Sequence, residues 1–202
     1  MLDITEGNQT ELKYSSKISR QTLKAVQSKY SWEDDYSPFD NLSTAYNEMF
    51  IDSLFELARQ SGDEDEVFFN KLTKPQKVMH VLSAFEGQVE NGGIFQFFWN
   101  IPHFHMAVLQ ALDEIRAEDL KRKYNQVLEE FVPHFDMIEQ LREQAAIDDF
   151  EASVDLYNQG REKLIHTKWF DTEFYDKANQ KQFHQRICTY VEKNIDLIAV
   201  IE

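Results

Sequence analysis

Acidic side chains at helical spacing are the groups of this sequence that could do chemistry. Asp148, Glu151 and Asp155 lie at positions i, i+3 and i+7, which places them on one face of a helix. Neighbours at such spacing have Cβ atoms about 5–6 Å apart. A DNA strand carries a phosphate about every 3.4 Å along its axis. A helix with this face could therefore approximate a row of phosphates, at lower density, and bind a basic surface.

The neighbouring residues support two interpretations of these carboxylates. The acidic face is offset by about 100° from an apolar stripe, which we expect to pack into the core. The stripe consists of Ile147, Phe150, Val154 and Tyr157, and Asp136, Glu139 and Glu143 repeat the acidic arrangement one segment earlier. Because acidic side chains also favour solubility, a solvated surface without a partner is the alternative to a phosphate-like face.

Charge is unevenly distributed along the chain. The net charge of −15 comes from 21 basic and 36 acidic residues. Residues 31–66 carry a net charge of −10 and residues 113–155 one of −8, whereas the rest is balanced or slightly basic. Direct binding to nucleic acid is disfavoured, because it needs Lys and Arg to neutralise phosphates. We predict that both stretches form one or two contiguous faces that contact a partner through Asp34, Asp35, Asp63, Glu64, Asp65, Glu66, Asp113, Glu114, Glu118, Asp119, Asp136, Glu139, Glu143, Asp148, Asp149, Glu151 and Asp155.

A second polar set lies where a long helix is predicted to end. Val78, Leu82, Phe85 and Val89 form one helical face, and Asn91-Gly92-Gly93 then favours a break, because Asn and Gly tolerate positive φ. Residues 94–99 are apolar on every side except at Gln96, so we expect them to be buried.

The polar residues of this region are Glu86, Asn91, Gln96 and Asn100. They could line a small-molecule pocket, but the set contains no Ser, Cys, Lys or His that could act as a nucleophile or titrate near neutral pH. We therefore favour a structural role: a helix end and a buried amide network, with Glu86 as a candidate hydrogen-bond partner.

Metal and thiol chemistry find little support. His103 and His105 match none of the common zinc spacings, and residues 63–66 lack the alternation and glycine of an EF-hand loop. Cys188 is the single cysteine and sits beside Ile187 in a predicted helix, so we expect it to be buried and inert. We expect no cofactor, no metal and no catalytic residue.

The elements that must position these groups are helices. Apolar spacing predicts a helix from Leu42 to near Gly62, a helix over 63–72 and a helix from the N-cap Thr73 to the glycine break. It predicts further helices over 108–115, 120–131, 138–157 (one long or two with a kink) and 183–198. Residues 31–41 and 169–171 are predicted loops. The fold class is all-α: a single globular multi-helix domain, with an N-terminal helix and loop (1–40) packed on a helical core (41–202).

Several features indicate where such a chain works. No apolar run approaches the roughly 20 residues of a membrane helix, and the first residues lack the features of a signal peptide. A lone cysteine allows no intramolecular disulfide. We expect a cytoplasmic protein without membrane contact. The apolar ending 195–201 lies either in the core or in a subunit interface, so a homodimer is one of two alternatives.

The spacing around the glycine break resembles a known family. Glu86, Asn91-Gly92-Gly93, Gln96 and Asn100 are similar to the signature of the acidic bacterial DNA-mimic protein family, and Asp171-Thr172-Glu173-Phe174-Tyr175 resembles its later Asp-x-x-Phe-Tyr element. The resemblance covers roughly residues 42–175. One departure is that relatives often continue Asn-Ser-Gly after the last Asn, whereas this chain has Asn100-Ile101-Pro102-His103.

The resemblance implies a helical, non-enzymatic acidic protein that mimics the charge of DNA. Its partner would be a basic DNA-binding protein, a transcription regulator or nucleoid protein, for which it competes with DNA. Two alternatives stay open. One is a small-molecule-binding or enzymatic domain that uses a polar cleft at residues 91–100. The other is an immunity or adaptor protein whose partner does not bind DNA.

Overall fold

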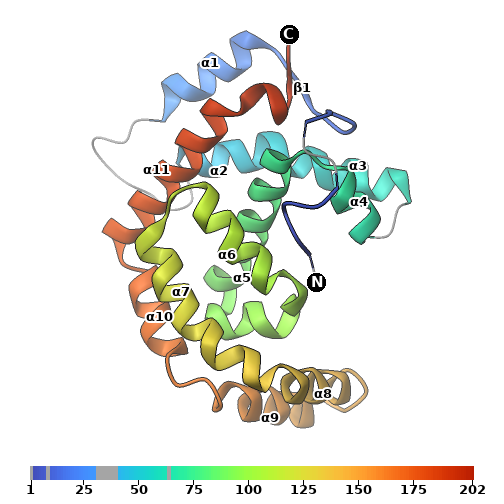
Figure 1. Ribbon diagram of the computed structural model, residues 1–202, viewed down its shortest axis with the longest axis vertical. Coiled ribbons are helices and arrows are strands. Elements are labelled where there is room, and N and C mark those ends of the chain that lie inside the picture. The colour runs from blue at the N-terminus through green and yellow to red at the C-terminus, as the bar shows by residue number, and fades with distance from the viewer. Residues whose placement is uncertain (1, 8–9, 31–40, 63–64) are drawn as a thin grey trace.

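The computed structural model describes residues 2–7, 10–30, 41–62 and 65–202, and it confirms the predicted all-α, single-domain fold (Figure 1). The long helix α5 (Lys74–Asn100) is central and packs against α6, α8, α10 and α11. The other helices are α1 (Arg20–Lys29), α2 (Leu42–Tyr46), α3 (Asp52–Ser61), α4 (Asp65–Lys71), α6 (His105–Glu114), α7 (Glu118–Phe131), α8 (Phe135–Ala145), α9 (Phe150–Arg161), α10 (Thr167–Phe174) and α11 (Lys177–Lys193).

The start of α5 is fixed by the predicted N-cap. The Thr73 hydroxyl accepts a hydrogen bond from the Gln76 backbone N–H, and the Gln76 side chain accepts one from the Thr73 N–H, which forms a capping box. The Gln76 amide also donates to the carbonyl oxygens of Tyr14, at 2.6 Å, and Ile198, at 2.9 Å. One buried side chain thereby binds α5 to segments near both ends of the chain.

The predicted break within α5 is confirmed. Gly92 has φ −166° and ψ 21°, and Gly93 has φ 83° and ψ 175°, so the helical hydrogen bonding is interrupted between two helical halves. A Cβ atom on Gly93 would lie 2.5 Å from Oδ2 of Asp171. Both the dihedral angles and the close approach of α10 therefore require glycine at position 93.

Aromatic rings from both halves of α5 form the centre of the core. The Phe85 ring makes edge contacts with Phe97 at 5.3 Å, Tyr124 at 5.6 Å and Phe174 at 5.7 Å between centroids. Tyr124 is fully buried, and its hydroxyl donates a 2.8 Å hydrogen bond to the carbonyl oxygen of His105. Edge-to-face packing of this kind holds α5, α7 and α10 together.

Several helix boundaries differ from the predictions. Between α2 and α3 the helix widens into a π-helical turn, η1 (Asn47–Ile51), and the run ends at Gly62, as expected, in a left-handed conformation. Residues 169–171, a predicted loop, lie inside α10, because burial of the Phe170 side chain outweighs the low helix propensity of an aromatic pair. Short 3-10 turns in the described part of the chain are η2 (Pro102–Phe104), η3 (Val132–His134) and η4 (Ile195–Leu197).

The two chain ends meet in a short parallel pair of strands, β1 (Lys17–Ile18) and β2 (Val200–Ile201). The last predicted helix therefore ends earlier than expected, at the close of α11. Ile198 and Ala199 are buried, so this part of the apolar ending belongs to the core. Residues 31–40 of the predicted loop 31–41 lie outside the described residues, and the boundary at residue 40 stays a prediction. None of the described helices is long and apolar enough to cross a membrane.

Candidate functional site

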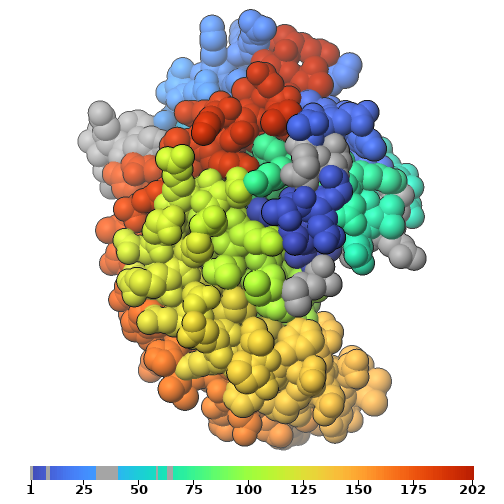
Figure 2. All heavy atoms as spheres, in the orientation of Figure 1, coloured from blue at the N-terminus to red at the C-terminus, as the bar shows by residue number. Residues whose placement is uncertain are grey.

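The helices α8 and α9 form an acidic hairpin, residues 135–161, at one end of the molecule (Figure 2). The hairpin contains seven acidic and two basic side chains, a net charge of −5. Asp149 begins α9, because its side chain accepts a 3.0 Å hydrogen bond from the Ala152 N–H. The predicted helical segment 138–157 is thus two helices joined by a turn.

Most carboxylates of the acidic hairpin are exposed and uncompensated. Glu139 is half-buried and pairs with Arg142 at 2.9 Å. Across the described ranges, no lysine or arginine forms an ion pair with the other exposed acids, which are Asp136, Glu143, Asp148, Asp149, Glu151 and Asp155. The hairpin therefore presents a concentrated negative surface to solvent.

The predicted apolar stripe beside these acids is wrong. Ile147 and Phe150 are each 85% exposed, and Val154 is 41% exposed. Because Asp149 caps α9, Ile147 falls in the turn before the helix and Phe150 in its first turn, beyond the reach of the core. Two large apolar side chains are thereby left in solvent among the carboxylates.

A different face of α9 packs against α5. The Tyr157 ring lies 4.9 Å from Phe95 and 5.3 Å from Trp99, centroid to centroid. Gly160 is buried there, and a Cβ atom on it would lie 2.9 Å from Phe95. Only the last member of the predicted stripe, Tyr157, therefore contributes to packing.

Acids of the turn between α6 and α7 are largely neutralised. Glu114 pairs with Lys74 at 2.5 Å, and Asp113 forms an ion pair with Lys121. Asp119 lies 3.9 Å from Arg122, while Glu118 is exposed without an ion pair to any described residue. This part of the predicted acidic face is weaker than the charge count suggests.

The first acidic stretch is described in part. Glu66 is exposed on α4, and Asp65 begins that helix. Asp34, Asp35, Asp63 and Glu64 lie outside the described residues, as does the side chain of Asp65. Whether the two acidic stretches form one face stays a prediction.

Glu86 contacts a histidine rather than the amides predicted for it. The Glu86 carboxylate and the His184 imidazole form a buried hydrogen-bonded pair between α5 and α11. The other ring nitrogen of His184 lies 3.5 Å from the Asn41 amide nitrogen. One turn later, burial and the nearby Glu86 charge raise the pKa of Glu90 to about 7, and the charge of His184 opposes the rise.

Gln88 is the hydrogen-bond acceptor for the signature amides. Its side-chain oxygen accepts hydrogen bonds from Gln96, at 3.2 Å, and from Asn100, at 2.7 Å. Gln96 is half-buried, whereas Asn91 and Asn100 are exposed, so the predicted buried amide network is wrong. Sequence reasoning missed Gln88, although three amides at positions 88, 96 and 100 were a visible signal.

The later Asp-x-x-Phe-Tyr segment caps both halves of α5 at the break. The Asp171 carboxylate accepts a 2.7 Å hydrogen bond from the Ile94 N–H, and the Tyr175 hydroxyl donates to the Val89 carbonyl oxygen. Burial raises the pKa of Asp171, and the hydrogen bond from Ile94 partly offsets that rise. This arrangement supports a structural role for the glycine break.

A shallow groove of about 410 Å³ lies beside the amides, between α5 and the acidic hairpin. Of its lining side chains, the Ser153 hydroxyl donates to the carbonyl oxygens of Ala145 and Asp149 at 2.7 and 2.8 Å. Burial raises the pKa of the lining Tyr157, which keeps its hydroxyl protonated. The groove thus lacks a nucleophile next to a general base.

His105 and Cys188 are buried in the core, whereas His103 is exposed. His105 is hydrogen-bonded through Nδ1 to the Pro102 carbonyl oxygen at 2.6 Å, and burial lowers its pKa. Cys188 is buried as predicted, and its burial raises the pKa of the thiol. The described residues contain no group of three His, Cys, Asp or Glu side chains that could hold a metal ion.

Comparison with protein families finds a match over most of the helical core. The family model of the DMP19-like protein matches residues 70–194, which span α5 to α11 and include the glycine break and the acidic hairpin. No curated protein and no solved structure matches the chain. Because the model covers more than half of the sequence, this chain belongs to the DMP19-like family, a family of DNA mimics by name.

Proposed function

We propose that this protein is a non-enzymatic DNA mimic that binds a basic DNA-binding protein, a transcription regulator or nucleoid protein, and competes with DNA for it. The acidic hairpin is the contact surface. The observation that carries the proposal is the set of exposed carboxylates there without ion pairs to described residues. Membership of the DMP19-like family supports it.

Charge on such a surface would attract an oppositely charged partner over a long distance. Uncompensated charge on one end of a molecule steers an oppositely charged partner and speeds encounter, and the effect weakens as salt shortens the Debye length to about 8 Å at physiological ionic strength. The exposed side chains of Ile147 and Phe150 add apolar area in the middle of the carboxylates. Contacts of that kind supply affinity at close range once charge has oriented the partner.

The test uses capture from the native cell extract. The full chain is immobilised, captured proteins are identified by mass spectrometry, and the complex is challenged with duplex DNA. We expect a DNA-binding protein that is retained at low salt, released at high salt and displaced by the duplex. The triple variant Asp148→Lys, Glu151→Lys and Asp155→Lys should lose that protein, because it inverts the charge of the hairpin turn and α9.

A matched control separates the surface from the total charge. Glu48→Lys, Glu129→Lys and Asp196→Lys change the net charge by the same amount, but these exposed carboxylates are scattered over other elements. The control should retain the partner. The proposal is wrong if excess duplex fails to displace the protein, or if the hairpin variant and the scattered variant behave alike.

A further inference from the structure

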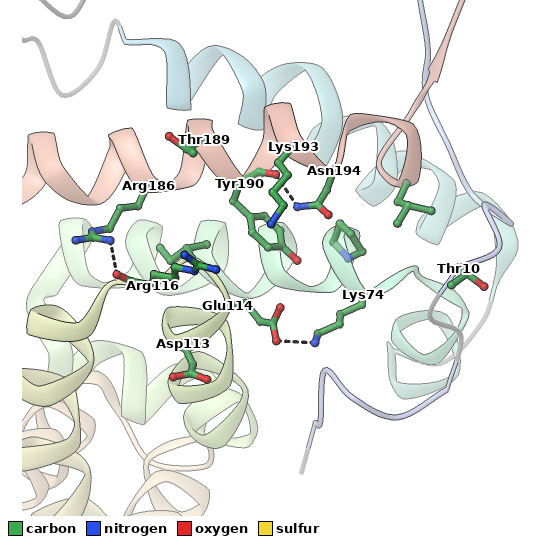
Figure 3. Close-up of a pocket in the computed structure, with 13 residues that line it drawn as sticks. Thr10, Lys74, Asp113, Glu114, Arg116, Arg186, Thr189, Tyr190, Lys193 and Asn194 are labelled. Carbon is green, nitrogen blue, oxygen red and sulfur yellow. Dashed lines mark hydrogen bonds and ion pairs between the residues drawn. The ribbon is translucent and has the colours of Figure 1, made fainter.

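A cleft of about 700 Å³ lies away from the acidic hairpin, between the start of α5, the α6–α7 turn and the C-terminal half of α11 (Figure 3). Figure 1 shows α8 and α9 at one end of the long axis of the molecule and the close of α11 near the other. The volume falls in the range of about 300–1,000 Å³ typical of small-molecule sites.

The cleft has more basic than acidic side chains in a protein of net charge −15, because Asp113 and Glu114 are the acidic residues among its lining. Its walls carry four basic side chains from separate parts of the sequence, namely Lys74, Arg116, Arg186 and Lys193. Lys74 is paired with Glu114, and Arg186 donates to the carbonyl oxygen of Arg116. Within the described ranges, Arg116 and Lys193 form no ion pair, so two cations face the cleft uncompensated (Figure 3).

Arg116 occupies a backbone position that favours glycine. Its φ is 57°, the one positive φ among the described non-glycine residues. The Ala117 N–H donates to the Leu112 carbonyl oxygen and the Arg116 N–H to that of Asp113, both at 2.9 Å, which is the Schellman motif that ends many helices at a glycine. An arginine here holds an unfavourable left-handed backbone conformation. Its guanidinium is thereby part of the cleft wall.

The other walls suit an organic group. Pro75, Ile115 and Leu197 contribute apolar surface, and Tyr190 and Asn194 add polar atoms. Burial raises the pKa of Tyr190, so its hydroxyl stays protonated and can donate a hydrogen bond to an anion.

We propose that this cleft binds a phosphate-bearing small molecule of nucleotide size. Its phosphate would lie between Arg116 and Lys193, because a guanidinium donates two parallel hydrogen bonds to phosphate oxygens and an ammonium adds charge. The organic part packs against Pro75, Ile115 and Leu197. This site is independent of the acidic hairpin and of the proposed DNA mimicry.

Calorimetric titration of the purified full chain tests the proposal with four probes: ADP, pyrophosphate, inorganic phosphate and adenosine. We expect ADP to bind at least about tenfold more tightly than adenosine. Tight binding of pyrophosphate would show that the cleft recognises the phosphate groups. Tighter binding of ADP than of pyrophosphate would show that the apolar wall contacts the organic part.

The informative variant is Arg116→Gly. Glycine fits the left-handed backbone, so the variant should fold with unchanged or higher melting temperature, yet bind ADP at least about tenfold more weakly. Lys163→Gln removes one positive charge from an exposed side chain outside the cleft and should leave affinity unchanged. The proposal fails if no phosphate-bearing probe binds, if adenosine binds as well as ADP, or if Arg116→Gly binds ADP like the unmodified protein.

Discussion

Gly93→Ala is the substitution for which the structure gives the sharpest expectation. The backbone at φ 83° and ψ 175° lies in a region that is essentially restricted to glycine, and a side chain there costs about 1–3 kcal/mol. The new Cβ would also lie 2.5 Å from Oδ2 of Asp171, so that carboxylate must move away from the Ile94 N–H. Loss of this charge-assisted hydrogen bond adds about 1.5 kcal/mol.

The two effects together predict a destabilisation of about 3 kcal/mol. For a chain of this length, each kcal/mol shifts the melting temperature by about 2–4 °C, so we expect a decrease of about 6–12 °C. Thermal unfolding followed by circular dichroism measures it. In an Asp171→Ala background the clash is absent, and Gly93→Ala should then cost only the dihedral part.

Gly62→Ala provides the matched control. Gly62 also has a positive φ, 65°, but a Cβ atom added there would have no neighbouring atom within 4 Å, so only a left-handed backbone cost of about 1 kcal/mol applies. The account of the break is refuted if Gly93→Ala lowers the melting temperature no more than Gly62→Ala, or if removing Asp171 leaves the effect of Gly93→Ala unchanged.

Two further substitutions test the core polar groups. Glu90 keeps its proton up to about pH 7 in the folded protein but loses it near its ordinary pKa when unfolded, so its contribution to stability falls as the pH rises from about 4.5 to 7. The stability of Glu90→Gln relative to the unmodified protein should therefore increase over that range, as measured by urea unfolding at several pH values. A stability difference that does not change with pH would contradict this expectation. Thr73→Ala should lower the free energy of unfolding by about 1–2 kcal/mol, because it removes the helix cap and the hydrogen bond to the Leu197 carbonyl oxygen. Thr73→Ser keeps the hydroxyl and should retain most of that stability.

Features fixed by neighbouring residues were predictable from the sequence. The capping box at Thr73 and Gln76 depends on residues three apart, and the break at Gly92 and Gly93 depends on two adjacent glycines. Both signals act on local backbone geometry, which tertiary packing here leaves unchanged. The all-α class follows from apolar spacing that is almost everywhere helical.

Features that depend on distant contacts were not predictable. The Asp171 carboxylate caps a backbone N–H 77 residues earlier, and Glu86 pairs with a histidine 98 residues later. Spacing alone offered no means of choosing His184 over the nearby amides. The apolar stripe failed for a different reason: the cap at Asp149 set the start of α9, which removed Ile147 from the helix and Phe150 from the core.

Charge counted along the sequence differs from charge presented in space. The net charge of −8 over residues 113–155 combines two unlike regions. In the α6–α7 turn, lysines from α5 and α7 pair with Glu114 and Asp113, and Arg116 from the same turn lines the cationic cleft. The exposed acids of the hairpin, in contrast, have no such partners in the described structure. Among the described residues, uncompensated negative charge is therefore concentrated at the end that carries α8 and α9.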